Sequence, residues 1–347
     1  MGKILVTGGA GYVGSVCSSE LLAHGHEVVV VDDLSAGHMD ALPKGARFYR
    51  ADIGDAEAIR SITAEHHIDA AFHFAAKALI PESVTNPALF FKVNVSSSLA
   101  LLEVLRTAGV KKFVFSSSAA VYGNPTSMPI DEDAPKAPVN SYGETKLCFE
   151  RALAWYASAY GISAVAFRYF NASGAAGGFG EDHRPETHII PLLLQAATGN
   201  REHFTIFGED YQTPDGTCLR DYVHVTDIAR AHILALQVDS PGFVAYNIGT
   251  GQSYSVRQVW KTAEDVLGRP INVCVGKRRP GDPAVLCANP SKIKKELGWI
   301  PKQSDLRNII QTAWNWMEER RPGPPLATGS PSQVRTRPRT TPARPFE

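Results

Sequence analysis

The sequence predicts an α/β protein built on a doubly wound parallel sheet with a smaller, interleaved α/β lobe. Short runs of apolar, mostly β-branched residues alternate with longer stretches of helical character, which is the rhythm of βαβ units. These runs are apolar throughout, as expected for strands that helices cover on both faces. They lie at residues 4–6, 28–31, 70–72 and 113–115. In such a sheet, ligands bind at the carboxyl ends of the strands.

The composition describes a globular chain with no charge bias. Its 347 residues are 44% hydrophobic, enough for a sizeable core and two lobes, and 35 basic residues balance 35 acidic ones. We therefore expect no nucleic-acid partner. The apolar run at residues 4–7 is too short for a signal peptide or a membrane span, so no membrane partner is expected either.

Cysteine and histidine usage gives no metal or disulfide signal. Five cysteines are scattered without a C-x-x-C pair, which favours a reducing compartment, and we expect a cytoplasmic protein. His224 and the pair His66 and His67 have no partners at ligand spacing, so each is interpreted as structural. The sequence therefore predicts no metal.

A glycine-rich turn follows the first predicted strand and precedes a stretch that can form a helix. The turn reads Gly-Gly-Ala-Gly-Tyr-Val-Gly over residues 8–14, a G-x-x-G-x-x-G spacing. Glycine allows the tight turn and lets a pyrophosphate approach the helix N-terminus, where free N–H groups and the helix dipole favour negative charge. The strand before it and the helix after it indicate a dinucleotide site rather than an ordinary loop.

Acidic residues at two strand ends favour NAD over NADP. Asp32 and Asp33 end the second strand, where a carboxylate accepts hydrogen bonds from ribose hydroxyls and repels a 2′-phosphate. For Asp33, a solvated acid in a turn remains an alternative. Asp52 and Ile53 follow the third strand and are expected to contact the adenine.

Tyr142 and Lys146 are the candidate reacting groups. Their Y-x-x-x-K spacing puts both on one face of a helix, where a nearby ammonium lowers the pKa of a phenol and favours a general base. The strand at residues 113–115 ends in three serines, of which Ser118 could hydrogen-bond the reacting oxygen. The alternative is that these serines only cap the next segment.

These segments together resemble the extended short-chain dehydrogenases, and among them the UDP-glucose 4-epimerases. The resemblance covers about residues 3–318, and its motifs occur in the order expected for that family. They lie at residues 8–14, 73–76, 116–123, 141–146, 168–171, 215–222 and 278–282. The resemblance implies a Rossmann-type fold, NAD as cofactor, a UDP-sugar as substrate and a homodimer formed through a helix pair.

By this resemblance, Tyr142 takes the proton of the sugar 4-hydroxyl, Lys146 binds the nicotinamide ribose and Ser118 assists. The hydride taken from C4 returns to the opposite face of the sugar, which interconverts UDP-glucose and UDP-galactose. The cofactor would be held by Gly8, Gly11, Tyr12, Val13, Gly14, Asp32, Asp52, Ile53, Phe74, Ala75, Ala76, Asn94, Tyr142, Lys146 and Tyr169. The substrate would be held by Ser118, Tyr142, Asn171, Phe207, Arg220, Arg279 and Asp282.

The sequence also predicts how the lobes are divided. Residues 1–175 are expected to form the NAD-binding Rossmann domain, to which residues 221–250 return. Residues 176–220 and 251–320 are expected to form the UDP-sugar lobe. Residues 321–347, rich in proline and arginine, are expected to be a disordered tail.

Several alternatives remain at this point. Leu286 stands where some family members have a bulky tyrosine, so a roomier pocket is expected to admit N-acetylated UDP-hexoses. A UDP-pentose or UDP-glucuronate 4-epimerase is the main alternative. A nucleotide-sugar dehydratase is disfavoured because Ala119 and Ala120 offer no extra acid. The last alternative is a non-catalytic regulator that binds NAD. For Arg220, a local ion pair with Asp221 is the alternative to phosphate binding, and the role of Lys77 stays open.

Overall fold

The large sheet has seven parallel strands. The computed structural model of this chain describes residues 1–279 and 281–320, so the predicted tail at 321–347 lies outside the described residues. The strands are β1 (Lys3–Thr7), β2 (Glu27–Asp32), β3 (Arg47–Arg50), β4 (Ala70–His73), β5 (Lys112–Ser118), β6 (Ser163–Tyr169) and β10 (Gly242–Ile248). Their order is β10-β6-β5-β4-β1-β2-β3, so the chain starts near the middle, winds outward to β3 and then returns to build the other half. The predicted doubly wound sheet is confirmed, and its strand order reverses between β1 and β4.

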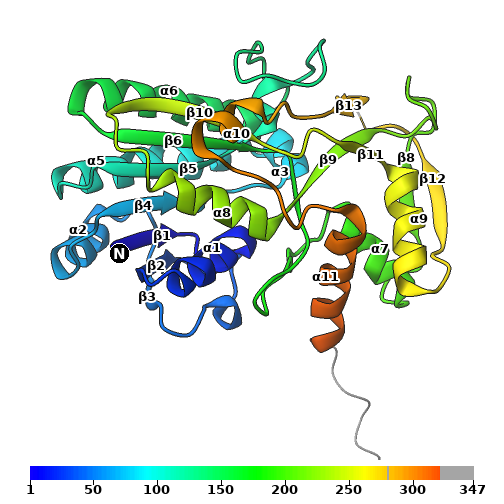
Figure 1. Cartoon of the computed structure of the whole chain (residues 1–347), viewed down its shortest axis with the longest axis horizontal. Helices are drawn as coiled ribbons and strands as arrows, with labels where there is room; N and C mark the ends of the chain where they lie inside the picture. Colours follow the sequence, from blue (N-terminus) through cyan, green and yellow to red (C-terminus); the bar gives the residue numbers. More distant parts are fainter. Residues whose placement is uncertain (280, 321–347) are drawn as a thin grey trace, which may run out of the picture.

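Helices cover both faces of this sheet (Figure 1). The larger ones are α1 (Tyr12–Ala23), α2 (Ala56–Glu65), α5 (Ser98–Thr107), α6 (Ser141–Tyr160) and α8 (Val225–Ala235). Shorter ones are η1 (Met39–Ala41), α3 (Ile80–Thr85), α4 (Pro87–Phe91), the π-helical η2 (Lys92–Ser97), η3 (Ala119–Tyr122) and α10 (Ser291–Leu297).

Alternate residues of each strand face the two helical layers. In β1, Leu5 packs in the core cluster formed with α2, α5 and α6, whereas Ile4 and Val6 pack in the cluster formed with α1, α8 and α10. The strands are therefore apolar on both faces. This arrangement explains why they read as continuous apolar runs in the sequence.

A second lobe is built around two small sheets. Strands β7 (Asn171–Ser173), β9 (Leu219–His224), β11 (Ser253–Ser255) and β13 (Val285–Leu286) form one of them, in which β9 pairs with the other three. Strands β8 (Phe204–Phe207) and β12 (Val273–Gly276) form the other. Helices α7 (Ile189–Ala197), α9 (Val256–Leu267) and α11 (Leu306–Glu319) pack beside them and share one apolar core.

The chain passes between the two parts several times. Strand β7 leaves the large sheet soon after β6 and pairs with β9. Helix α8 then packs on α1, and β10 pairs with β6, so residues 225–248 lie with the large sheet. The first residues of the predicted returning segment, up to His224, belong instead to β9.

One helical stretch, Pro87–Thr107, is long and apolar enough to cross a membrane by length and composition alone. Its second half supplies Leu101, Leu102 and Leu105 to the core cluster on one face of the large sheet. The buried helix of a globular core passes the same test, so this stretch carries only weak evidence for a membrane.

Candidate active site

A cavity of about 620 Å³ lies along the carboxyl ends of the parallel strands. Gly8 follows β1, Asp32 ends β2, Phe74 follows β4 and Ser118 ends β5, and all four line it. The cavity continues to residues of the second lobe, and its volume lies within the ordinary range for small-molecule sites, about 300–1,000 Å³. The site is thus where a doubly wound sheet is expected to bind ligands.

The glycine turn is packed too tightly for side chains. Gly8 has φ +72°, and a Cβ added there would lie 2.5 Å from the backbone N of Ala75. A Cβ at Gly14 would lie 2.2 Å from the carbonyl oxygen of Gly8. Helix α1 begins directly after Gly11, which caps it without a side-chain hydrogen bond. The turn therefore presents the helix N-terminus to the cavity, as an anion such as pyrophosphate requires.

Asp32 supports this turn as well as facing the cavity. Its carboxylate accepts hydrogen bonds from the backbone N–H of Ala10 at 3.0 Å and of Leu34 at 2.9 Å. Burial raises the pKa of Asp32, although these two bonds lower it in part. Asp52 and Ile53 also line the cavity, and the Asp52 carboxylate accepts from the backbone N–H of Gly54 at 2.7 Å.

Helix α6 positions the two candidate reacting groups. Asn140 caps the helix by accepting a hydrogen bond from the backbone N–H of Gly143 at 2.8 Å, which fixes its first turn. The Lys146 ammonium donates to the carbonyl oxygen of Ser116 at 2.8 Å and lies 5.8 Å from the Tyr142 ring centroid. Tyr142, Lys146 and Ser118 all line the cavity, so the predicted grouping is present.

The electrostatics of this pair differ from the sequence-based expectation. Burial raises the pKa of Tyr142, and a hydrogen bond with Ser118 lowers it only in part. Burial lowers the pKa of Lys146 to about 7, against the charge of Glu150, which raises it. Lys146 alone does not lower the pKa of the phenol here, because both groups are withdrawn from water.

A buried ion pair supports α6 from behind the cavity. The Arg168 guanidinium forms two hydrogen bonds with the Glu150 carboxylate, at 3.0 Å and 2.7 Å. Ser117, which precedes Ser118 on β5, donates to the same carboxylate. Since Glu150 lies one turn after Lys146, this pair ties α6 to β5 and β6.

Basic groups lie at the far end of the cavity. Arg220 on β9 and Arg279 both line it, and Arg220 forms an ion pair with Asp282. Asp221 instead accepts hydrogen bonds from the backbone N–H groups of Thr250, Gly251 and Ala288. The partner of Arg220 is therefore Asp282, not the neighbouring Asp221. Asn171, the first residue of β7, lines the same end.

Most residues expected at the site line this cavity. They are Gly8, Gly11, Tyr12, Val13, Gly14, Asp32, Asp52, Ile53, Phe74, Ala75, Ala76, Ser118, Tyr142, Lys146, Tyr169, Asn171, Arg220, Arg279 and Asp282. Asn94 lies behind it, where its amide bonds the backbone of Lys77 and the hydroxyl of Thr145. Phe207 also lies outside the lining and stacks under the Arg279 guanidinium, 4.1 Å from the ring centroid. Their roles at the site stay predictions.

The segment that follows β7 received no role from the sequence, in which the function of His188 stayed open. Four of its side chains, Glu181, His183, Glu186 and His188, place potential ligand atoms within 4.8 Å of one another. His188 Nδ1 lies 2.6 Å from Glu181 and 2.9 Å from Glu186. These hydrogen-bond distances are shorter than the roughly 3.3 Å between two ligands of a tetrahedral zinc ion, estimated from bonds of about 2.0 Å.

Opposite charges contact each other in this cluster. Burial lowers the pKa of His188, but the charges of Glu181 and Glu186 outweigh burial and raise it to about 10. Burial likewise raises the pKa of Glu181, and the two histidines outweigh it and lower the value to about 2. The two carboxylates thus hold an imidazolium, and the absence of a metal stays a prediction. The closely spaced acids and histidines of residues 181–188 were the available signal.

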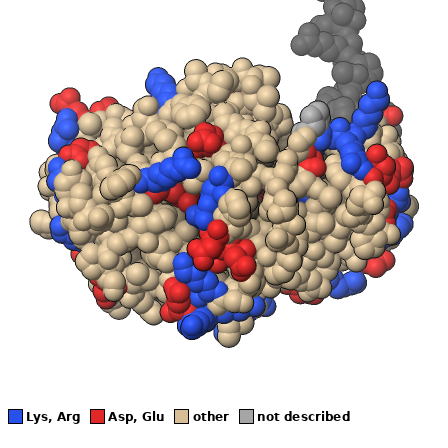
Figure 2. All heavy atoms as spheres, turned by 90° about the horizontal axis from the view of Figure 1, so that it is seen from above, with Lys and Arg blue, Asp and Glu red and all other residues tan. Residues whose placement is uncertain are grey.

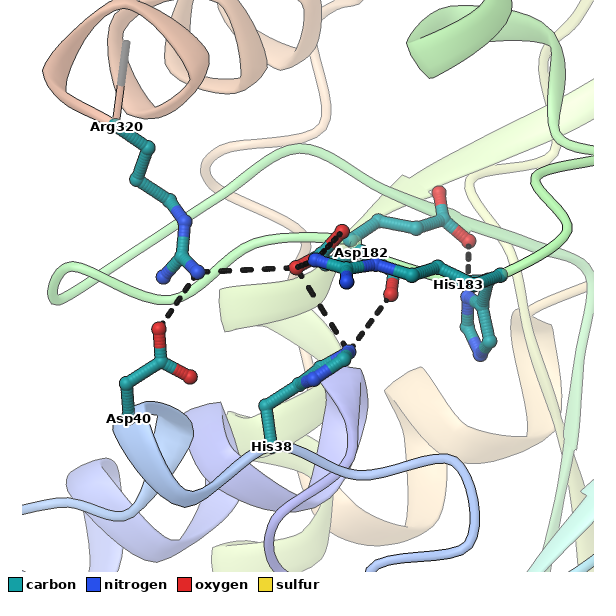
Figure 3. A network of polar contacts seen from close by, with 7 residues as sticks. His38, Asp40, Asp182, His183 and Arg320 are labelled. Carbon is teal, nitrogen blue, oxygen red and sulfur yellow. Dashed lines mark hydrogen bonds and ion pairs between the residues drawn. The ribbon is translucent and has the colours of Figure 1, made fainter. Parts of the chain in front are cut away.

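Asp182, in the same segment, contacts residues from two other parts of the chain. Figure 3 shows Asp182 between His38, which follows β2, and Arg320, which follows α11, with His183 beside it. All four line the cavity. On the face seen in Figure 2, basic and acidic side chains are intermixed, in keeping with the balanced charge of the chain.

Comparisons with known proteins agree with this geometry. The family model described as "NAD dependent epimerase/dehydratase family" matches residues 4–249. The chain is 48% identical over 313 residues to the UDP-glucose 4-epimerase of Corynebacterium glutamicum, covering 90% of this chain and 94% of the relative.

Two solved structures share the whole fold. The UDP-glucose 4-epimerase of Brucella ovis in complex with NAD superposes with a TM-score of 0.88 at 43% identity, covering 91% of this chain and 98% of that one. The enzyme of Bifidobacterium longum in complex with NAD⁺ and UDP gives a TM-score of 0.87 at 36% identity, covering 92% and 98%. With the glycine turn, the tyrosine–lysine pair and the basic far end in one cavity, this chain belongs to the NAD-dependent epimerase/dehydratase family.

Proposed function

We propose that this chain is a UDP-glucose 4-epimerase that interconverts UDP-glucose and UDP-galactose with NAD as a catalytic cofactor. The observation that carries the proposal is one continuous cavity lined by the glycine turn after β1, by Tyr142 on α6, and by Arg220 and Arg279 of the second lobe. The named activity of the relatives supports the same substrate.

The residues present fit NAD. The turn at Gly8 and Gly14 has no room for side chains, so its backbone lies open to a pyrophosphate. Asp32 offers a carboxylate at the end of β2 to ribose hydroxyls. When bound, NAD would accept the hydride from C4 and return it, and its oxidised ring would add a positive charge near the Tyr142 phenol.

The proton of the sugar 4-hydroxyl would be transferred with the help of Tyr142, Lys146 and Ser118. Tyr142 Oη would take the proton of the sugar 4-hydroxyl, and the Ser118 hydroxyl would hold the reacting oxygen by a hydrogen bond. The Lys146 ammonium would bind a ribose hydroxyl of NAD. Because burial raises the pKa of Tyr142 in this structure, the phenol depends on neighbouring positive charge to become a base.

The second lobe would hold the UDP portion. Arg220 and Arg279 would bind the diphosphate by charge-assisted hydrogen bonds, which leaves the sugar free to present either face to the cofactor. Asp282 would bind the uridine ribose, and Asn171 would bind the diphosphate. Since Arg220 is ion-paired with Asp282, binding would require this guanidinium to turn toward the phosphate. Phe207 and Asn94 would act indirectly, by supporting Arg279 and the backbone of Lys77.

The sugar pocket is predicted to tolerate a larger substituent. Leu286, on β13, lines the cavity and is branched and shorter than a tyrosine. We infer that N-acetylated UDP-hexoses can enter. The 4-epimerisation of UDP-pentoses or UDP-glucuronate is the disfavoured alternative, because the curated relatives named above act on UDP-glucose by name.

We also propose a homodimer located in the cytoplasm. Trp155 and Tyr160 on α6 are exposed, as is Phe91 on the neighbouring α4. An exposed aromatic face of this kind marks a protein interface. The five cysteines are free thiols, which suits a reducing compartment.

A panel assay tests the activity. Purified protein is incubated without added cofactor with UDP-glucose, UDP-galactose, UDP-N-acetylglucosamine, UDP-xylose and UDP-glucuronate, and the products are separated. We expect rapid 4-epimerisation of the first two and slower turnover of the acetylated sugar. A protein that turned over only the pentose or the glucuronate would contradict the proposal.

The variant Tyr142→Phe isolates the proposed base. We expect it to retain NAD and to lose about 10²–10⁴-fold in kcat, the usual contribution of general acid–base catalysis. Tyr49→Phe, on β3 and outside the cavity lining, is the matched control and should keep full activity. Equal activity of both variants would remove Tyr142 from the mechanism.

A further inference from the structure

Three segments that are far apart in the sequence meet at the dinucleotide end of the cavity (Figure 3). Residues 38–40 follow β2, residues 178–183 follow β7, and residues 316–320 form the end of α11 and the residue after it. Each segment contributes residues to the lining of the same cavity. This end is therefore closed by parts of both lobes.

Asp182 is at the centre of the contacts between them. The His38 ring donates through Nε2 to the main-chain oxygen of Asp182 at 2.9 Å and lies 3.7 Å from its carboxylate. Arg320 lies 3.7 Å from the same carboxylate and 2.6 Å from that of Asp40. These contacts run in series from His38 through Asp182 and Arg320 to Asp40, and they link the first lobe, the segment after β7 and the residue after the last helix.

A second contact holds the segment against α11. Trp316 Nε1 donates to the carbonyl oxygen of Gly178 at 3.0 Å. A Cβ added at Gly180 would lie 2.4 Å from the Trp316 ring, so the segment lies flat on this ring only because Gly180 has no side chain. The Arg320 guanidinium lies over the same ring, 5.2 Å from its centroid.

The contacts among His38, Asp40, Asp182 and Arg320 are joined to the glycine turn that would bind pyrophosphate. The backbone N–H of His38 donates to the carbonyl oxygen of Ala10 at 3.0 Å, within the glycine turn. Asp32, the proposed ribose ligand, lies six residues before His38. A dinucleotide lying between the glycine turn and residues 178–183 would therefore be covered by this segment.

We propose that His38, Asp40, Asp182 and Arg320 form a clasp that must open before NAD can leave, and that the clasp retains the cofactor between turnovers. The inference rests on the proposed function, because it takes NAD as the ligand of this end of the cavity. Retention suits a reaction in which the cofactor returns to its starting state in every cycle. Each contact is partly exposed and weak by itself, so the clasp can still open to load the cofactor.

NAD exchange tests the clasp directly. The holoenzyme is mixed with an excess of isotopically labelled NAD, and the release of the original cofactor is followed by mass spectrometry. Arg320→Ala removes two of the contacts at once, and we expect release to be about tenfold faster, which corresponds to the loss of two weak ion pairs. Asp182→Asn and Gly180→Ala, which disturb the other side of the clasp, should accelerate release as well.

Arg184→Ala is the matched control. Arg184 pairs with the same Asp182 carboxylate, at 3.2 Å, but it lies on the same segment, is largely exposed and does not line the cavity. Its loss cannot release one segment from another, so exchange and epimerase activity should match those of the wild type. A release rate for Arg320→Ala equal to that of Arg184→Ala would overturn the clasp and leave the proposed function intact. Wild-type protein that binds no NAD would instead overturn the proposed function itself.

Discussion

Lys146 occupies a position where its charge is costly. The side chain is only 3% exposed, and burial lowers its pKa from 10.5 to about 7. Its ammonium donates a hydrogen bond to the carbonyl oxygen of Ser116 at 2.8 Å. A charge kept in such a place indicates a functional demand that stability alone would not select.

We predict that Lys146→Met stabilises the fold while abolishing turnover. A pKa change from 10.5 to about 7 corresponds to roughly 5 kcal/mol as an upper bound. The substitution also leaves the Ser116 carbonyl oxygen without its donor, so a net gain of about 2 kcal/mol in the free energy of unfolding is expected. Urea unfolding of the cofactor-free protein measures it.

The stability gained by Lys146→Met should decrease as pH rises. Below pH 7 the lysine is protonated in both states, and the full cost falls on the folded state. Between pH 7 and 10.5 the unfolded chain binds the extra proton, so the stability of the wild type rises with pH and its disadvantage shrinks. Lys146→Met should therefore gain more at pH 6 than at pH 9. Lys111→Met, at an exposed position, is the control, and a pH-independent gain would contradict the argument.

At the scale of elements, α6 carries the reacting groups and their support on one face. Its first turn is capped by Asn140, and it ends at Gly161, which has φ +65°. Tyr142, Lys146 and Glu150 follow each other at intervals of four residues, so the phenol, the ammonium and the carboxylate lie in one row. The buried bond from Glu150 to Arg168 on β6 fixes the rotation of the helix against the sheet.

Removing one partner of the Glu150–Arg168 pair should lower the free energy of unfolding strongly. Glu150→Gln leaves the Arg168 charge buried without a carboxylate partner, and we expect a loss of about 3–5 kcal/mol in the free energy of unfolding. Replacing both partners, as in Glu150→Leu with Arg168→Met, should cost less than the single change because no charge stays buried. Urea unfolding of the two variants checks this order. Glu103→Gln breaks an exposed pair with Arg106 and is expected to change little. A double variant less stable than the single one would refute the argument.

Local spacing explains which elements the sequence could predict. Strands β1, β2, β4 and β5 contain continuous apolar runs, and the glycine turn and the Tyr142–Lys146 pair are set by neighbours within seven residues. The second lobe was harder, because its strands are short. The last four residues of strand β9 were expected in the returning segment, and in the structure β9 pairs with β7, β11 and β13.

Contacts over long sequence separations could not be predicted in this way. Arg220 pairs with Asp282, which is 62 residues away, and Arg320 pairs with Asp40, which is 280 residues away. No periodicity links such residues. The resemblance places Asn94 and Phe207 at the site, but it could not show that Asn94 bonds the backbone of Lys77 or that Phe207 lies against the Arg279 guanidinium.

At the scale of the whole molecule, the two lobes share one cavity, and the large-sheet lobe has one uncovered helical face. The continuous helical stretch Pro87–Thr107 is strongly apolar, yet only 39% of its most apolar window is buried within this chain. It includes α4 and α5, both of which pack against α6. Trp155 on α6 is 77% exposed. A second copy of the chain would cover this apolar surface and explain its composition better than a membrane would, because the buried side of the same stretch belongs to the core.

We therefore expect the 37.6 kDa chain to sediment at about twice its mass, as a symmetric homodimer. Trp155→Glu puts a charge into the proposed interface, and the cost of burying an unpaired carboxylate should shift the protein to monomer at micromolar concentration. Ile300→Glu is the matched control, since Ile300 is 63% exposed but lies between α10 and α11, away from α6. Sedimentation velocity of the wild type and the two variants over a concentration series measures which of them are dimers. If Trp155→Glu stays dimeric at every concentration at which the wild type does, the interface lies elsewhere, because a buried charge on this face would be too costly to tolerate.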